Sequence, residues 1–223
     1  MHIEPGLVDS SKMVLSYATA AAAAIYTIKQ MASDVTSRGV VSLTLRMVIS
    51  TALVFAFFQV MPHYRAGVSE VHFIFGSTLF LLFGSAPSAV GMAAGLFLQG
   101  ALFEPIDLPQ FGMNVTTLIA PLLLVSSLAN KIVSPKTAYA DLTYRQTFAL
   151  SSVYQAGIVT WVSFWVIYGQ GMSMATVSSL ASFASAYIAV IMVEPLVDAV
   201  VLSTAKMFKK NSAIFSYRLY SEA

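Results

Sequence analysis

The chain has 223 residues, of which 57% are hydrophobic and only 10% are charged. Soluble domains carry roughly 25% charged residues, and disordered chains combine high charge with low hydrophobicity. The composition therefore excludes both an ordinary soluble domain and a disordered chain. Because the sequence contains no cysteine, it also excludes a disulfide framework, a thiolate metal site and a cysteine nucleophile. We interpret the chain as an all-α integral membrane protein.

Apolar segments recur along the whole chain, and a helix needs about 20 such residues to cross a hydrocarbon core of about 30 Å. The run from Val71 to Phe103 is too long for one span and is interrupted at Gly84-Ser85-Ala86-Pro87. Proline disfavours a helical residue before it, so we expect two helices joined by a tight turn. The seven predicted transmembrane helices are Lys12–Met31, Gly39–Met61, Gly67–Phe83, Pro87–Phe103, Asn114–Val133, Gln146–Gly169 and Ala175–Met207.

These helices predict a single transmembrane domain over residues 1–223, with an N-terminal segment at 1–11 and a cytoplasmic tail at 206–223. Ten of the twelve lysines and arginines fall on the side of the C-terminus, and only Lys12 and Arg65 fall on the other side. The positive-inside rule then places the N-terminus outside and the C-terminus inside. Five acids lie on the outer side, where they either attract cations or are simply scattered over loops: Glu4, Asp9, Glu70, Glu104 and Asp107.

Several chemistries have no motif in this sequence. There is no GxxxxGK[ST] stretch for nucleotide phosphates, so we do not expect the chain to hydrolyse ATP itself. HExxH, GxSxG and a basic-aromatic nucleic-acid surface are also absent. Glu194 and Asp198 lie four residues apart on one predicted helix face, but no nucleophile or base is paired with them. The sequence therefore gives little support to an intramembrane enzyme or to a nucleic-acid partner.

The N-terminus combines groups that can chelate a metal ion. Residues 1–11 lack the basic and apolar regions of a secretory signal, so we expect the mature chain to begin at Met1. The Met1 amine, the His2 backbone nitrogen and the His2 imidazole can then close a five-membered and a six-membered ring on one ion. A deprotonated amide favours square-planar nitrogen geometry, which suits Ni(II) or Cu(II). A histidine at a terminus by itself also fits a frayed end or a tag.

Two further histidines differ in their surroundings. His72 lies in the predicted third helix, one or two turns below its outer end, and ionisable groups at membrane depth are costly and usually functional. His72 is therefore the natural fourth nitrogen ligand. His63 follows Pro62 at the predicted interface, where a solvated role is favoured over a ligand role. Gly6 allows the backbone to turn tightly, so the N-terminal segment could fold back and bring His2 to His72.

Short motifs along most of the chain resemble the CbiM/NikM family. Met1-His2-Ile3-Glu4-Pro5-Gly6-Leu7 is similar to its MHIxxGF opening, and Gln99-Gly100-Ala101-Leu102-Phe103 is similar to its QALLF stretch. Phe83-Gly84 resembles the FGP turn with the proline displaced to Pro87, and Gly112-Met113-Asn114 resembles the GAN motif at the family's spacing. Glu194 corresponds to the acid of a late EG motif. The sequence departs from the family after His72, where the usual proline and threonine are missing.

The resemblance implies a function. CbiM and NikM proteins are the substrate-binding S components of energy-coupling-factor transporters of the ABC type, which import cobalt or nickel across the plasma (inner) membrane of bacteria and archaea. It implies a square-planar site made by the Met1 amine, the His2 amide and imidazole nitrogens and the His72 imidazole. The substrate ion would be Co(II) or Ni(II), with no organic cofactor. Square-planar chemistry favours nickel, whereas the family's commonest role, cobalt supply for corrinoid (cobalamin) synthesis, favours cobalt. The implied partners are a transmembrane T component and cytoplasmic ATP-binding subunits.

Other residues are candidates for supporting roles. Asn114 either caps the fifth helix or holds the N-terminal segment near the site. Glu194 precedes Pro195, where freed backbone carbonyls need partners, and it either makes a buried hydrogen bond to a neighbouring helix or takes part in coupling. Glu70 and His63 are further candidates for a supporting or structural role beside the metal.

Two alternatives stay open at the level of sequence. Gly91 with Gly95, and Ala20 with Ala24, allow close approach of helices, which serves either packing within the bundle or docking of a partner. The rival hypothesis for function keeps the bundle but drops transport: a membrane metal sensor or assembly subunit with a vestigial site. Genes for an ATPase and a T component beside this one would favour transport over that rival.

Overall fold

The structure of the protein is a computed structural model, which describes residues 2–134 and 137–209. Over these residues the chain forms seven α-helices and one short β-hairpin, so the prediction of an all-α membrane protein with about seven helices is confirmed. The elements are α1 (Met13–Arg38), α2 (Val40–Gln59), β1 (Tyr64–Ala66), β2 (Ser69–Val71), α3 (Gly76–Phe83), α4 (Ser85–Leu102), η1 (Pro105–Gln110), α5 (Phe111–Ile132), η2 (Tyr139–Asp141), α6 (Tyr144–Gln170) and α7 (Met174–Lys209).

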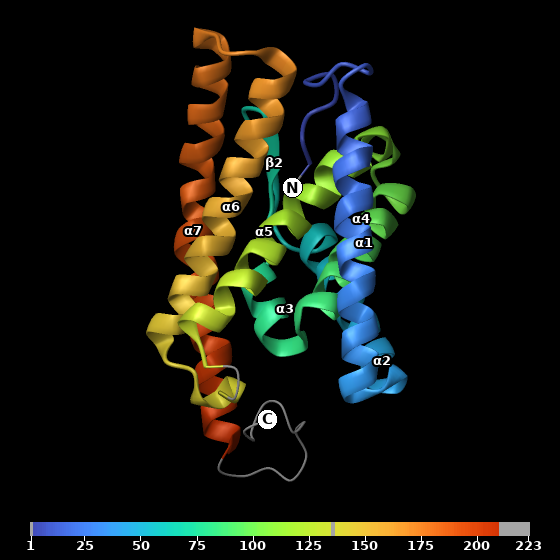
Figure 1. The fold of residues 1–223 in the computed structure, drawn as a ribbon. Coiled ribbons are helices and arrows are strands. Elements are labelled where there is room, and N and C mark those ends of the chain that lie inside the picture. Colours follow the sequence, from blue (N-terminus) through green and yellow to red (C-terminus); the bar gives the residue numbers. More distant parts are fainter. Residues whose placement is uncertain (1, 135–136, 210–223) are drawn as a thin grey trace.

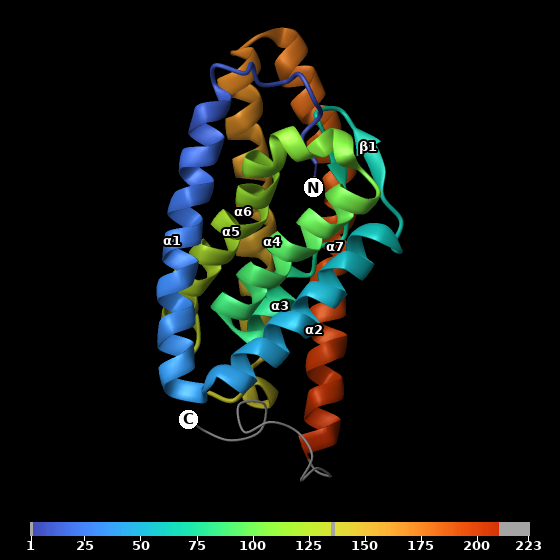
Figure 2. The same ribbon diagram turned by 90° about the vertical axis from the view of Figure 1, so that its right-hand side faces the viewer.

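The long helices run along the length of an elongated bundle. In Figure 1, α1 lies on one side, α6 and α7 lie on the other, and the short α3 lies between them. Figure 2 shows α2 and α4 crossing the bundle at an incline. Within the described part of the chain, four stretches are long and apolar enough to cross a membrane: Val40–Gln59, Pro105–Ile132, Tyr144–Gln170 and Met174–Met207. The length and composition of these helices agree with a multi-pass membrane protein.

The predicted third helix, Gly67–Phe83, is wrong over its first half. Residues 64–71 form the antiparallel hairpin β1–β2, and the helix begins only at Gly76. Gly67 has a φ of +60° at the first position of the two-residue turn, which is where a tight hairpin turn needs glycine. The eight residues of α3 extend only about 12 Å at 1.5 Å per residue, so α3 does not cross a membrane. His72 accordingly lies in a loop and not on a helix.

The first helix is longer than predicted. It continues past Met31 through residues 32–38, which were expected to form an inside loop, and ends where Gly39 adopts a φ of +81°. No glycine or proline occurs between Met31 and Gly39, so nothing in this stretch interrupts the helix. The break between the third and fourth helices occurs at Gly84, with a φ of +92°, and Pro87 lies within the first turn of α4, a position that tolerates proline.

The glycine pair Gly91 and Gly95 serves the packing of α4 against α2. A side chain added at Gly91 would overlap Ser50, and one added at Gly95 would overlap Val54. These close approaches explain why glycine occupies two positions one helical turn apart. Ala20 and Ala24 of α1 instead line a large apolar groove.

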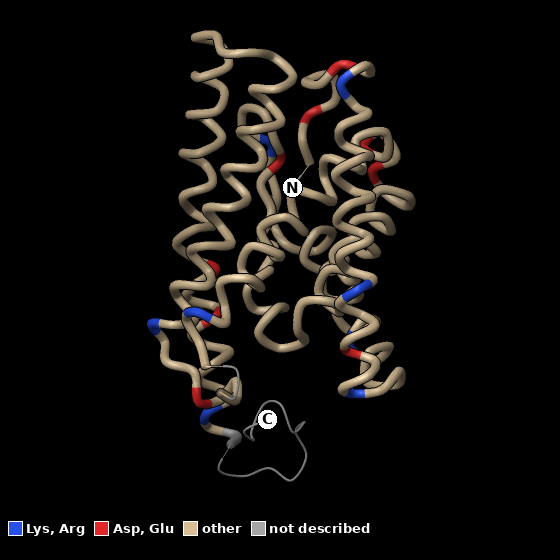
Figure 3. The backbone as a smooth tube through the Cα atoms, in the orientation of Figure 1, with Lys and Arg blue, Asp and Glu red and all other residues tan. Residues whose placement is uncertain are grey.

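The charged residues divide between the two ends of the bundle. Figure 3 shows most Lys and Arg toward the end that carries the C-terminus, whereas acids dominate the end that carries the loop between the N-terminus and α1. The orientation of the two ends across the membrane stays a prediction from this charge distribution. His2, the first described residue, is buried inside the bundle.

Candidate metal centre

The N-terminal segment folds back into the bundle and lies along the hairpin as an additional short strand. Ile3 forms an antiparallel bridge with Ser69. The Glu70 backbone N–H donates to the His2 carbonyl at 2.8 Å, and the Glu4 N–H donates to the Val68 carbonyl at 3.2 Å. Because backbone pairing fixes the register of a strand, these bonds set the position of His2 relative to β2.

Buried contacts anchor the same segment from the opposite side. Ile3 is fully buried and packs in a cluster with Val8, Met113 and Trp165. Its backbone N–H donates to Asn114 Oδ1 at 2.9 Å. Asn114 lies within α5 and makes no side-chain cap there. Its side chain instead contacts the N-terminal segment.

His72 follows β2 directly and has 1% of its surface exposed. Its Nε2 lies 2.8 Å from Glu70 Oε2. Burial alone raises the pKa of the Glu70 carboxyl, but its contacts with His72 outweigh this and place that pKa at about 2. Burial lowers the pKa of the His72 imidazole well below its ordinary value. The ring is therefore neutral at pH 7, and Nε2 is the nitrogen that donates to the carboxylate.

This tautomer leaves the lone pair of His72 on Nδ1, which is buried and has no hydrogen-bond partner among the described residues. Histidines that bind metals in proteins commonly donate their other ring N–H to a carboxylate, which fixes the tautomer and orients the ring. The pairing of Glu70 with His72 has this arrangement. Nδ1 of His72 is thus presented as a free metal-ligating nitrogen.

His2 is also buried and is paired with an acid. Its Nδ1 lies 2.6 Å from Asp107 Oδ2, while its Nε2 has no partner among the described residues. Burial lowers the pKa of the His2 imidazole, and Asp107 offsets part of this effect. The neutral ring thus keeps an unpartnered nitrogen, as His72 does. A terminal chelate uses Nδ1, however, so it requires the ring to turn away from Asp107.

The two rings meet in one place although they come from distant parts of the chain. Their centroids are 5.2 Å apart, and ligand atoms of His2, Glu70 and His72 lie within 4.8 Å of one another. Phe58 of α2 packs edge-on against both rings. His63 stacks on His72 at 4.9 Å between centroids, and its Nε2 lies 4.0 Å from Glu70 Oε1. The structure thus brings together three of the predicted ligand and supporting side chains and covers them with a fourth.

The surroundings of this cluster suit a small cation. A cavity of about 10 Å³ beside His2 is lined by four acids together with Arg65, and a space of this size holds about one water-sized particle. Its acids are Glu4, Glu70, Glu104 and Asp107. They line the same space as His2 and outnumber the one cation there, Arg65, which favours a divalent ion over an anion. Met1, the remaining predicted ligand, lies outside the described residues.

Glu194 lies apart from the histidines, in the core of the bundle. It is fully buried and accepts hydrogen bonds from the backbone N–H of Ile74 and from Gln155 Nε2 of α6. The hydrogen bond to a neighbouring helix that the sequence predicts for this residue is therefore present. The sequence does not predict its other hydrogen bond, with the backbone of the loop that follows His72.

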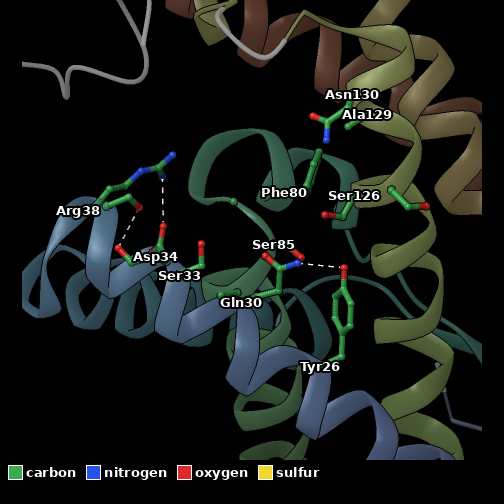
Figure 4. A pocket seen from close by; sticks show the side chains of 14 residues that line it. Tyr26, Gln30, Ser33, Asp34, Arg38, Phe80, Ser85, Ser126, Ala129 and Asn130 are labelled. Atoms are coloured by element: carbon green, nitrogen blue, oxygen red, sulfur yellow. Dashed lines mark hydrogen bonds and ion pairs between the residues drawn. The ribbon is translucent and has the colours of Figure 1, made fainter.

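A larger cavity of about 380 Å³ lies near the opposite end of the bundle, between α1, the junction of α3 with α4, and α5. Figure 4 shows polar side chains around it, including Gln30, whose Nε2 donates to the Tyr26 hydroxyl, and the ion pair of Asp34 with Arg38. Its described lining contains no histidine. This cavity is not the predicted metal site.

Sequence reasoning missed two residues of the metal site. Asp107 was considered only as one of several outer acids, and Phe58 was considered only as part of an apolar helix. Neither has a local signal, because each reaches the site through the fold from far along the chain. Gly67 is a residue type that favours a turn over a helix, and this signal could have placed His72 outside a helix.

Comparisons with known proteins accord with this architecture. A family model described as the cobalt uptake substrate-specific transmembrane region, CbiM, matches residues 2–211. The chain belongs to the CbiM family. As a CbiM protein, it is a multi-pass membrane component of cobalt or nickel uptake. No match is found among the curated proteins.

Two solved structures share the CbiM fold seen here. One, described as a transition metal transporter, superposes with a TM-score of 0.71 at 16% identity and covers 98% of this chain and 99% of its own. The other, a truncated transition metal transporter, has a TM-score of 0.64 at 16% identity and covers 93% of this chain and 97% of its own. At this identity the likeness shows the fold alone. The coverage is near-complete for both chains, so the likeness extends over the bundle as a whole.

Proposed function

We propose that this CbiM protein is the metal-capturing S component of an energy-coupling-factor transporter, and that it binds Co(II) or Ni(II) at its outer end. The observation that carries the proposal is Nδ1 of His72, a buried ring nitrogen that has no hydrogen-bond partner among the described residues and lies beside the buried imidazole of His2. Burying such an atom is costly unless a ligand completes it. A free nitrogen beside a second imidazole favours a metal ion.

In the proposed site, the Met1 amine, the His2 backbone nitrogen and the His2 imidazole chelate the ion, and Nδ1 of His72 completes a square of nitrogens. Four nitrogen donors suit nickel or copper better than magnesium or calcium. Metal binding then exchanges the contact of His2 Nδ1 with Asp107 for a metal bond. Glu70 keeps its hydrogen bond with His72 and orients that ring.

Power for transport would come from other subunits: a transmembrane T component and cytoplasmic ATP-binding subunits. The sequence supports this division of labour, because it lacks a phosphate-binding loop. A groove of about 480 Å³ on the bundle, lined by Ala20, Ala24 and other small or apolar residues, offers close approach to a helix of the T component.

The test is the metal content of purified protein after exposure to equal cobalt, nickel, copper and zinc. Three forms are compared: the protein with its native N-terminus and a C-terminal tag, the same protein with three additional residues before Met1, and the variant His72→Ala. We expect the native form to retain one ion and the other two to retain none. The extension abolishes the terminal amine chelate without altering any side chain.

The other outcomes are informative. If the extended form binds as well as the native form while His72→Ala does not, the rings alone hold the ion and the terminal chelate is wrong. If His72→Ala retains the parental metal content, the site itself is wrong. If no form binds, capture by this subunit is wrong and a non-transporting sensor or assembly role takes its place.

A further inference from the structure

The side chain of Glu194, on α7, contacts the segment that follows His72 in the chain. We propose that Glu194 is a positioning residue that fixes the His72 loop, residues 72–75, so that Nδ1 of His72 faces the metal. This inference rests on the proposed function, because it assigns a task to a residue that does not touch the ion. It makes metal affinity depend on a carboxylate in the core of the bundle.

The contacts of Glu194 connect the loop to two helices. One carboxylate oxygen accepts from the backbone N–H of Ile74, two residues after His72. The other accepts from Gln155 Nε2, and Gln155 Oε1 in turn accepts from the hydroxyl of Tyr187. These side chains are all buried, and hydrogen bonds to a buried carboxylate are stronger than neutral ones. The loop is thereby tied to both α6 and α7.

The conformation of the loop shows why it needs such a tie. Phe75, the last residue before α3, has a φ of 52°, a left-handed conformation that is unfavourable for residues other than glycine. A strained residue persists only where its surroundings hold it. Phe75 is buried with 5% of its surface exposed, and its ring packs at 4.9 Å from Phe57. Backbone hydrogen bonding to Glu194 at Ile74 and this packing hold the loop from its two faces.

Asp198 provides an internal comparison. It lies one helical turn beyond Glu194, is equally buried, and accepts from the hydroxyls of Ser77 and Thr78. Those residues belong to α3 and not to the loop. Asp198 therefore anchors the helix, whereas Glu194 anchors the backbone beside the metal ligand. Variants of these two acids therefore distinguish a general loss of stability from a loss of positioning of the loop.

The test uses three variants of the full chain: Glu194→Gln, Asp198→Asn, and the double variant Glu194→Gln/Gln155→Glu. In Glu194→Gln one of the two acceptor oxygens becomes an amide donor, so the side chain can no longer accept from both the Ile74 N–H and Gln155 Nε2. The double variant exchanges the amide and the carboxylate. It restores an acceptor for the Ile74 N–H, for the new amide and for the Tyr187 hydroxyl.

Two readouts are taken for each variant. Amide hydrogen exchange over residues 70–79 reports the loop without any metal, and binding of Ni(II) and of Co(II) reports its consequence. We expect Glu194→Gln to speed exchange in the loop and to weaken metal binding about 10- to 100-fold, as loss of a supporting contact commonly does. The double variant should recover both. Asp198→Asn should lower the melting temperature as much as Glu194→Gln does but keep metal affinity within about threefold of the parent.

Parental exchange and parental metal affinity in Glu194→Gln would overturn the inference. So would equal losses of affinity in Glu194→Gln and Asp198→Asn, because this would make the effect one of stability alone. If the parent protein itself binds neither ion, the proposed function fails, and the exchange data alone then decide whether Glu194 holds the loop. If Glu194→Gln does not fold, the double variant is compared with Asp198→Asn instead. The inference is then overturned if amide exchange in the loop is no slower in the double variant than in Asp198→Asn.

Discussion

The protein holds two polar clusters that differ in how completely the hydrogen bonds of their buried members are satisfied. The histidine cluster consists of His2, His63, Glu70, His72 and Asp107; the carboxylate cluster consists of Ser77, Thr78, Gln155, Glu194 and Asp198. In the first, two imidazole nitrogens have no partner among the described residues. In the second, every side chain is bonded to another group of the protein.

This difference separates a binding site from a structural joint. Buried polar groups are nearly always satisfied, so an unsatisfied nitrogen beside acids indicates a missing ligand, whereas a satisfied carboxylate indicates a role within the protein. Both clusters meet at the same short segment, residues 72–78. The histidine cluster includes the first residue of this segment, and the carboxylate cluster holds residues 74–78. Variants that affect one cluster and spare the other test this division.

The largest loss of stability is expected from Asp198→Ala. This change leaves the hydroxyls of Ser77 and Thr78 buried without their acceptor, and each such group costs about 1–3 kcal/mol. We expect the free energy of unfolding in detergent to fall by about 3 kcal/mol. Thr204→Ala, at an exposed position on the same helix, is the control and should change it by less than about 0.5 kcal/mol. Equal stability of the two variants would contradict the structural role.

A smaller effect, this time on the metal, is expected from Asn114→Ala. The backbone N–H of Ile3 then loses its buried acceptor, and the segment that carries His2 is held only by the hairpin. We expect metal affinity to fall about tenfold and the free energy of unfolding to fall by about 1 kcal/mol. Titration with Ni(II) and with Co(II) measures the first effect. Asn130→Ala, at an exposed position on the same helix, is the matched control. An equal fall in the metal affinity of Asn130→Ala would contradict the role assigned to Asn114.

The sequence predicts which residues belong to the histidine cluster better than it predicts their arrangement. Composition and apolar runs predict the helices, because burial in lipid and helix length obey local rules. His2 was recognisable from the chemistry of a free N-terminus. The helix predicted around His72 was wrong, because the strand that pairs with β2 in the Ile3–Ser69 bridge comes from the N-terminus, far away in the chain. No local pattern contains that partner.

The carboxylate cluster was less predictable still. A proline after Glu194 drew attention to that residue, but its contact with the Ile74 backbone depends on how α7 crosses the loop. Asp198 was seen only as a second acid on the same helix face. Its partners Ser77 and Thr78 lie on α3, 120 residues or more before it. Polar groups inside a bundle choose partners through helix packing, which one sequence does not reveal.

The smallest expected effect is on the pH dependence of the free energy of unfolding, which is measured without any metal. Burial lowers the pKa of His72 well below its ordinary value, whereas in the unfolded chain the ring titrates near 6.5. Below that pH the unfolded state binds more protons than the folded state, so stability must fall as pH falls. Between pH 7.5 and 5.5 the loss that His72 contributes is on the order of 1 kcal/mol. Glu70, with a folded pKa of about 2, contributes mainly below this window.

The measurement is the free energy of unfolding at pH 7.5, 6.5 and 5.5 in detergent and excess chelator, for the parent and for His72→Phe. The phenyl ring keeps the packing against Phe58 and His63 but cannot take a proton. The variant should therefore lose the part of the pH dependence that His72 contributes, while His2, whose pKa burial also lowers, keeps a smaller slope of the same sign. A parental slope in His72→Phe would mean that the folded protein protonates His72 as readily as the unfolded chain does. The ring would then be charged below pH 6.5, and the free nitrogen on which the metal site depends would be taken by a proton.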